Sequence, residues 1–182
     1  DVLSLTLGEP DFATPKSIQE AAIASIQNGE ASFYTPVGGI KPLITSIINR
    51  TKEDYGISYE PSEIVVGTGA KFILYTLFQT ILNEADEVII PVPYLVSYAS
   101  QVELAEGKPV FVEGQEDNGF KVSVEDLEKA RTSKTKAFIL NSPCNPTGAI
   151  YSPQELEKIG NLAVKHNILI VADDIYGKLV YN

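Results

Sequence analysis

The sequence predicts an α/β fold, a three-layer αβα sandwich built around a mainly parallel sheet. Short apolar runs rich in β-branched residues alternate along the chain with longer amphipathic segments. This alternation is typical of a sheet that carries helices on both faces. The runs are continuous in apolar character, which indicates strands buried on both sides. The 182 residues are enough for one sizeable domain with its own core.

Five segments have the length and composition of such strands. They are residues 63–67 (EIVVG), 87–91 (EVIIP), 110–112, 137–140 (AFIL) and 168–172 (ILIVA). Helix signals lie between them. Thr14-Pro15 and Ser152-Pro153 each place a capping residue before a proline at the first helical position, and Glu155 completes a capping box with Ser152. The first helix is expected to end at Asn28-Gly29, and residues 70–82 carry a wide apolar helical face.

Composition and charge exclude several classes of protein. The net charge of −10 argues against a nucleic-acid surface, which would need clustered Lys and Arg. No apolar run reaches the length of a membrane span, and the first residues show no secretory signal. A single cysteine cannot form an internal disulfide, which suits a reducing compartment. We therefore expect a cytoplasmic protein without nucleic-acid or membrane partners.

Ligands of open α/β sheets bind beyond the carboxyl ends of the strands, and four segments follow such ends: residues 67–71, 93–98, 141–148 and 173–176. Residues 67–71 (GTGAK) join a predicted strand to a helix, so their backbone N–H groups and the helix dipole favour a phosphate. An ordinary turn is the alternative. Residues 141–148 (NSPCNPTG) form a rigid loop in which Asn145 can donate to a ring oxygen. The alternative there is a loop stiffened for topology alone.

Asp173 ends the last predicted strand, where an unpaired carboxylate would be costly. A cationic partner is therefore expected, and a protonated pyridine nitrogen would serve, since the negative carboxylate keeps it protonated. A helix N-cap is the alternative role. Tyr176 could then hydrogen-bond a phenolic oxygen of the same ring. Of two other tyrosines, Tyr98 is expected in the core, and Tyr94 is left open between core and ligand.

Five motifs together resemble the class I aminotransferases of fold type I, which depend on pyridoxal phosphate. They are LGEPDF at 7–12, YTPVGG at 34–39, GTGAK at 67–71, NSPCNPTG at 141–148 and DDIY at 173–176. The likeness is strongest to the bacterial aspartate aminotransferases and covers essentially the whole chain. It implies an incomplete large domain of that fold over residues 14–182, with residues 1–13 belonging to the small domain.

The resemblance assigns roles to individual residues. Asp173 would pair with the pyridinium nitrogen and, with Tyr176, count as catalytic. Asn145 and Tyr176 would contact the phenolic oxygen, and Asn145 would also bind substrate. The other cofactor contacts would come from Gly69, Ala70, Lys71, Leu95 and Tyr34. No metal-binding residue is assigned.

Two of these roles imply particular partners. Tyr34 would reach the phosphate of the neighbouring subunit's cofactor, which implies a homodimer with shared active sites. Gly8 would hold the α-carboxylate side of the amino-acid or 2-oxo-acid substrate through its backbone. Leu95 stands where close relatives carry an aromatic residue stacked on the cofactor ring. The change removes roughly 0.5–1.5 kcal/mol of aromatic stacking.

The expected activity belongs to a longer protein. In the family, the catalytic lysine and two ligand-binding arginines follow the position of Asn182, so the chain is expected to be an inactive N-terminal fragment. The full-length enzyme is expected to transaminate between an amino acid, aspartate in the first place, and a 2-oxo acid. Aromatic, branched or alanine-type substrates are the alternative, as is a non-catalytic aminotransferase-like sensor module. The strand at 63–67 is expected to lack its neighbours in the seven-stranded family sheet.

Overall fold

The computed structural model describes residues 3, 8–9 and 11–181. They fall into two compact units, one ending at Val66 and one beginning at Gly67. In the described part of the first unit lie two α-helices and two 3₁₀ turns: α1 (Lys16–Gln27), η1 (Glu30–Ser32), α2 (Lys41–Tyr55) and η2 (Pro61–Glu63). Because the expected division at residue 13 concerns the domains of a longer protein, it stays a prediction. No described helix is both long and apolar enough to cross a membrane.

The second unit is built on a four-stranded parallel sheet. Its strands are β1 (Glu87–Val92), β2 (Lys108–Glu113), β3 (Thr135–Asn141) and β4 (Leu169–Asp173), in the order β2-β1-β3-β4. These strands confirm four of the five expected segments. The register places Asn141 directly beside Asp173 at the carboxyl edge. Two loops that are distant in sequence therefore begin next to each other at the same edge of the sheet.

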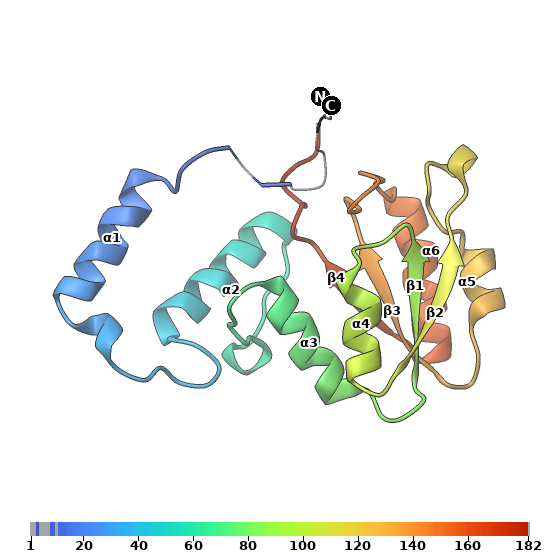
Figure 1. Ribbon diagram of the computed structural model, residues 1–182, viewed down its shortest axis with the longest axis horizontal. Coiled ribbons are helices and arrows are strands. Elements are labelled where there is room, and N and C mark those ends of the chain that lie inside the picture. Colours follow the sequence, from blue (N-terminus) through green and yellow to red (C-terminus); the bar gives the residue numbers. More distant parts are fainter. Residues whose placement is uncertain (1–2, 4–7, 10, 182) are drawn as a thin grey trace. The chain divides into compact units, whose positions relative to one another are not determined.

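Helices cover the two faces of this sheet, as Figure 1 shows, with α3 (Ala70–Ile81) and α4 (Ser97–Leu104) on one side. The helices α5 (Val124–Ala130) and α6 (Pro153–His166) lie on the other. An apolar core lies on each face of the sheet, and alternate residues of β1 point into one or the other. Val88 and Ile90 pack with α3 and α4, and Ile89 packs with α5 and α6. Each fully buried aliphatic side chain stabilises the fold by roughly 1.5–3 kcal/mol. The predicted three-layer αβα sandwich is confirmed.

Two expectations about the strands are wrong. Residues 63–67 are not a strand: Ile64 is extended, with φ −119° and ψ 130°, but the sheet does not include it. The Val66 N–H instead donates to the Gly38 carbonyl at 2.9 Å. Apolar composition favours an extended backbone, but a strand also needs a neighbour for its hydrogen bonds. β4 is not covered on both faces either, since Leu169 is 46% and Ile170 38% exposed.

The helix signals were mostly correct. α6 begins at Pro153 with the predicted capping box: the Ser152 hydroxyl accepts from the Glu155 N–H, and the Glu155 carboxylate accepts from the Ser152 N–H. α1 ends at Gln27 as expected, before Asn28 and a left-handed Gly29. Its start differs, because Pro15 is extended at the N-cap and no side chain caps the helix.

Glu155 also connects α6 to a distant loop. Both of its carboxylate oxygens accept from the Lys121 ammonium, at 2.7 and 2.9 Å. This contact, followed by the Ser152 N–H, lowers the pKa of Glu155 to about 2 from an ordinary value of 4.5. A lowered pKa in the folded state means that the stabilisation is complete above pH 4.5 and is lost as the pH falls towards 2.

We expect Glu155→Gln to lower the free energy of unfolding by about 1 kcal/mol at pH 7, because it weakens a helix cap and an ion pair together. The difference from the unsubstituted protein should shrink between pH 4.5 and 2. Thermal unfolding followed by circular dichroism measures both effects. Glu157→Gln, on an exposed turn of the same helix, is the control and should be neutral. A difference that stays constant down to pH 2 would show that the ionised Glu155 carboxylate does not stabilise the fold.

Candidate functional site

A pocket of about 270 Å³ lies at the carboxyl edge of the sheet, entirely within the second unit. We call it the carboxyl-edge pocket. It brings together the loops after β3 and β4 and the starts of α3 and α4. Its lining residues are Gly69, Ala70, Lys71, Leu74, Leu95, Ser97, Tyr98, Gln101, Asn141, Asn145, Asp173, Ile175 and Tyr176. All the predicted site residues that belong to the second unit are therefore in its wall.

Asp173 is the buried charged group of this pocket, with only 7% of its surface exposed. Its Oδ2 accepts from the Tyr98 hydroxyl at 2.7 Å, and its Oδ1 accepts from the Ile175 N–H at 3.3 Å. Within the described part of the chain Asp173 forms no ion pair. A turn follows it rather than a helix, so the alternative role as a helix N-cap is wrong. The carboxylate is held by neutral donors, and its burial favours a cationic partner.

Tyr98 is in the core, as expected, but it also reaches the pocket. Its side chain is 1% exposed and packs among residues of α3, β1 and β3. Burial, and then the adjacent Asp173 carboxylate, raise the pKa of Tyr98 far above its usual value, so the phenol keeps its proton and donates. Sequence reasoning missed this contact. The available signal was general: a buried tyrosine hydroxyl needs a polar partner.

Three polar side chains connect the two loops beside Asp173. Asn141 donates from Nδ2 to the Asp173 carbonyl at 2.8 Å, and its Oδ1 accepts from the Asn145 N–H at 2.7 Å. Asn145 in turn donates from Nδ2 to the Tyr176 hydroxyl at 3.2 Å. The amide of Asn145 and the phenol of Tyr176 thus meet at the pocket, as the sequence predicts for two groups that share one ligand oxygen. Asn141, the residue that fixes both loops, was not singled out.

The start of α3 forms another part of the pocket wall. Gly69 precedes the helix with φ 94° and ψ 156°, a conformation essentially restricted to glycine. No side chain caps α3, so its first N–H groups are free to bind an anion. Lys71 adds a positive charge to the same wall. These features suit a bound phosphate group. An ordinary turn would not require all of them.

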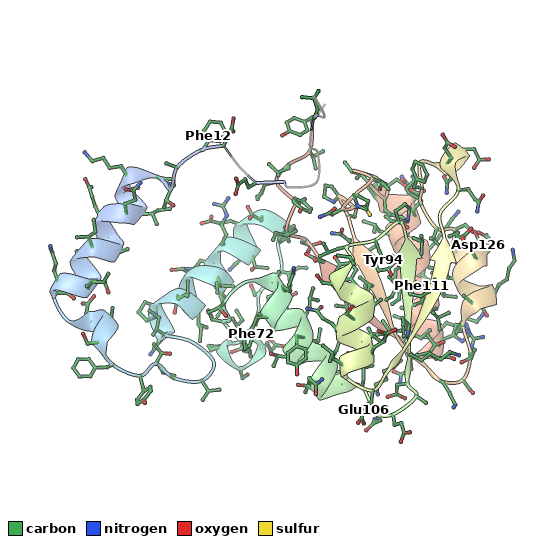
Figure 2. All side chains as sticks on the ribbon, viewed as in Figure 1. Phe12, Phe72, Tyr94, Glu106, Phe111 and Asp126 are labelled. Atoms are coloured by element: carbon green, nitrogen blue, oxygen red, sulfur yellow. The ribbon has the colours of Figure 1, made fainter. Side chains whose placement is uncertain are left out.

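Leu95 and Tyr94 are neighbours with different surroundings. Leu95 lines the carboxyl-edge pocket and offers it an aliphatic surface. Tyr94 does not line it: its ring stacks on Phe111 of β2, with centroids 5.4 Å apart and planes 24° apart, and both rings are labelled in Figure 2. Tyr94 also lines a separate, smaller pocket together with Tyr98, Asn141 and Asn145, so its role stays open between packing and ligand contact.

Tyr34 and Gly8 belong to the first unit, where both are exposed, and their roles stay predictions. Of the 7–12 motif, Leu7 and Pro10 lie outside the described residues. Local packing explains why glycine ends the 34–39 motif. Gly39 has a φ of 112°, and a Cβ there would lie 2.7 Å from the Val66 side chain.

The chain belongs to the aminotransferase class I and II family, whose model matches residues 1–182. This confirms the resemblance drawn from the five motifs. The chain is 60% identical over 182 residues to an asparagine–oxo-acid transaminase of Streptococcus mutans. It is 56% identical over 181 residues to an aspartate aminotransferase of Bacillus subtilis. In both comparisons all of this chain is covered but only 46% of the relative, so the chain spans about half the length of the curated relatives it matches.

Solved structures support the same fold. An aspartate aminotransferase of Thermus thermophilus with maleate matches with a TM-score of 0.95 and 42% identity, over 98% of this chain and 46% of that one. An aromatic aminotransferase of Pyrococcus horikoshii also matches with a TM-score of 0.95, at 40% identity, over all of this chain and 48% of that one. The sheet and its helices are those of fold type I aminotransferases.

We expect Tyr98→Phe to destabilise the protein by about 1.5–3 kcal/mol, because it leaves the buried Asp173 Oδ2 without its donor. Thermal unfolding at pH 7 measures the loss. Tyr94→Phe is the control. It removes a hydroxyl that does not contact Asp173 and should change the unfolding temperature little. If both substitutions have the same small effect, the Tyr98 hydroxyl does not stabilise a buried carboxylate.

Proposed function

We propose that the carboxyl-edge pocket binds pyridoxal phosphate, and that a protein of the relatives' full length containing this chain is an aminotransferase. The observation that carries the proposal is Asp173: a buried carboxylate in a pocket wall, held by two neutral donors and without an ion pair among the described residues. A protonated pyridine nitrogen supplies the missing positive charge. The carboxylate in turn favours the protonated ring.

The other lining groups fit the remaining parts of the cofactor. Its phosphate suits the uncapped start of α3 at Gly69-Ala70, with Lys71 as counter-charge. Its phenolic oxygen suits the meeting point of the Asn145 amide and the Tyr176 hydroxyl. Three chemically different parts of one ligand therefore find matching groups in a single pocket.

Each residue has a defined task in the proposed reaction. The cofactor, when bound, supplies an electron sink for the bonds at the substrate's Cα. Asp173 holds a proton on the ring nitrogen, which makes the ring electron-withdrawing. Tyr98 and the Ile175 N–H keep the carboxylate in place, and Asn141 fixes the loop that presents Asn145. These contacts are formed by the fold itself, so the groups are oriented before the ligand arrives.

We propose aspartate as the first amino donor to test and asparagine as the second. The relatives named aspartate aminotransferase support the former, at 53–56% identity. The relative named asparagine–oxo-acid transaminase supports the latter, at 60% identity. The aromatic aminotransferase among the similar structures keeps aromatic donors as a third arm of the same assay.

We also propose that the protein forms a homodimer with shared active sites and acts in the cytoplasm. In that assembly Tyr34 reaches the phosphate of the partner's cofactor, and Gly8 contacts the substrate's carboxylate side through its backbone. Tyr34 and Gly8 are both exposed in the described part of the first unit. This exposure leaves the Tyr34 side chain and the Gly8 backbone accessible to a partner or a ligand.

We expect Asp173→Asn, made in the full-length protein, to lower kcat by roughly 10²–10³ while the cofactor still binds, because the neutral amide cannot hold the ring nitrogen protonated. Steady-state turnover with aspartate, asparagine and phenylalanine as donors and a 2-oxo acid as acceptor measures the loss. Asp174→Asn, at the exposed neighbouring carboxylate, is the matched control. Near-normal turnover in Asp173→Asn would mean that Asp173 is only structural.

A further inference from the structure

Gln101 is a buried polar residue of the carboxyl-edge pocket to which the proposed function gives no task. It lies on α4, is 7% exposed and lines the pocket. Its Nε2 donates to the Lys71 carbonyl at 2.8 Å, which connects α4 to the first turn of α3. The acceptor on Lys71 fixes the orientation of the amide, because only the NH₂ group can donate to a carbonyl.

The other half of the same amide is unsatisfied. Gln101 Oε1 is shielded from solvent and has no hydrogen-bond partner among the described residues. A buried acceptor without a donor destabilises the folded state. The Lys71 carbonyl lies inside α3, where the helix already provides it with an N–H four residues on. The fold alone therefore gains little from this glutamine, and an apolar side chain of similar length would avoid the cost.

We infer that Gln101 is a positioning residue for the phosphate group of the ligand, an inference that rests on the proposed function. Its bond to the Lys71 carbonyl holds the first turn of α3 against α4. No side chain caps the N–H groups of that turn, so they can donate to an anion. A fixed turn keeps these donors aimed at one point, so less ordering remains to be done when the phosphate binds. The buried amide thus lowers the free energy of unfolding of the protein by itself, and in return it improves binding of the phosphate.

The test uses the full-length protein and two ligands that differ only in the phosphate, pyridoxamine phosphate and pyridoxamine. Gln101→Met removes the amide at similar length. Gln101→Asn keeps an amide that is one methylene too short to reach Lys71, and it serves if the methionine variant folds poorly. Gln79→Met is the matched control. Gln79 also joins α3 to α4, through its Nε2 and the Leu104 carbonyl at 2.9 Å, but it does not line the pocket.

We expect both Gln101 variants to bind pyridoxamine phosphate about three- to tenfold more weakly, because a turn that the amide no longer holds must be ordered when the phosphate binds. The affinity of both variants for pyridoxamine should stay within about twofold of that of the unsubstituted protein. Calorimetric titration measures both ligands, and the unfolding temperature of Gln101→Met should be unchanged or higher. Gln79→Met should bind both ligands as the unsubstituted protein does.

Other outcomes overturn the inference in distinguishable ways. Unchanged affinity for pyridoxamine phosphate in the Gln101 variants shows that the glutamine does not position the phosphate site. An equal loss for both ligands shows a general structural role instead. If the unsubstituted protein binds neither ligand, the proposed function fails and this inference fails with it.

Discussion

The arrangement of the pocket depends on one buried charge, the Asp173 carboxylate at the carboxyl end of β4. A charge at this depth has to be compensated, and the described chain compensates it only with the Tyr98 hydroxyl and the Ile175 N–H. Neutral donors orient the carboxylate but leave its charge in place. The buried carboxylate is therefore electrostatically unfavourable by itself, and a cationic ligand can compensate its charge.

Parallel strand topology explains why the complementary groups gather around this charge. All four strands run the same way, so the loops after β3 and β4 and the starts of α3 and α4 open on one edge. The register places Asn141 beside Asp173, and Asn141 then connects to Asn145. The two apolar cores support this edge, because α3 and α4 contribute side chains to one face of the sheet and α5 and α6 to the other.

Local signals predicted much of this structure. β-branched runs identified four strands, capping chemistry identified the start of α6, and motif residues such as Asn145 and Tyr176 were correctly brought together. The segment at 63–67 has the composition of a strand but no partner in the sheet, and pairing cannot be read from composition. The Tyr98–Asp173 and Gln101–Lys71 contacts span 75 and 30 residues. Such contacts arise from the packing of helices on the sheet, which no local pattern specifies.

We propose that the Asp173 carboxylate provides the countercharge for a protonated pyridine ring. Nitrogen-15 NMR of labelled pyridoxal phosphate bound to the full-length protein tests it most directly. We expect the ring nitrogen of the bound cofactor to stay protonated at a pH where the free cofactor has lost that proton. The proton should be lost again in Asp173→Asn. An unprotonated ring nitrogen in the unsubstituted protein at that pH, or the same signal in both proteins, would contradict the claim.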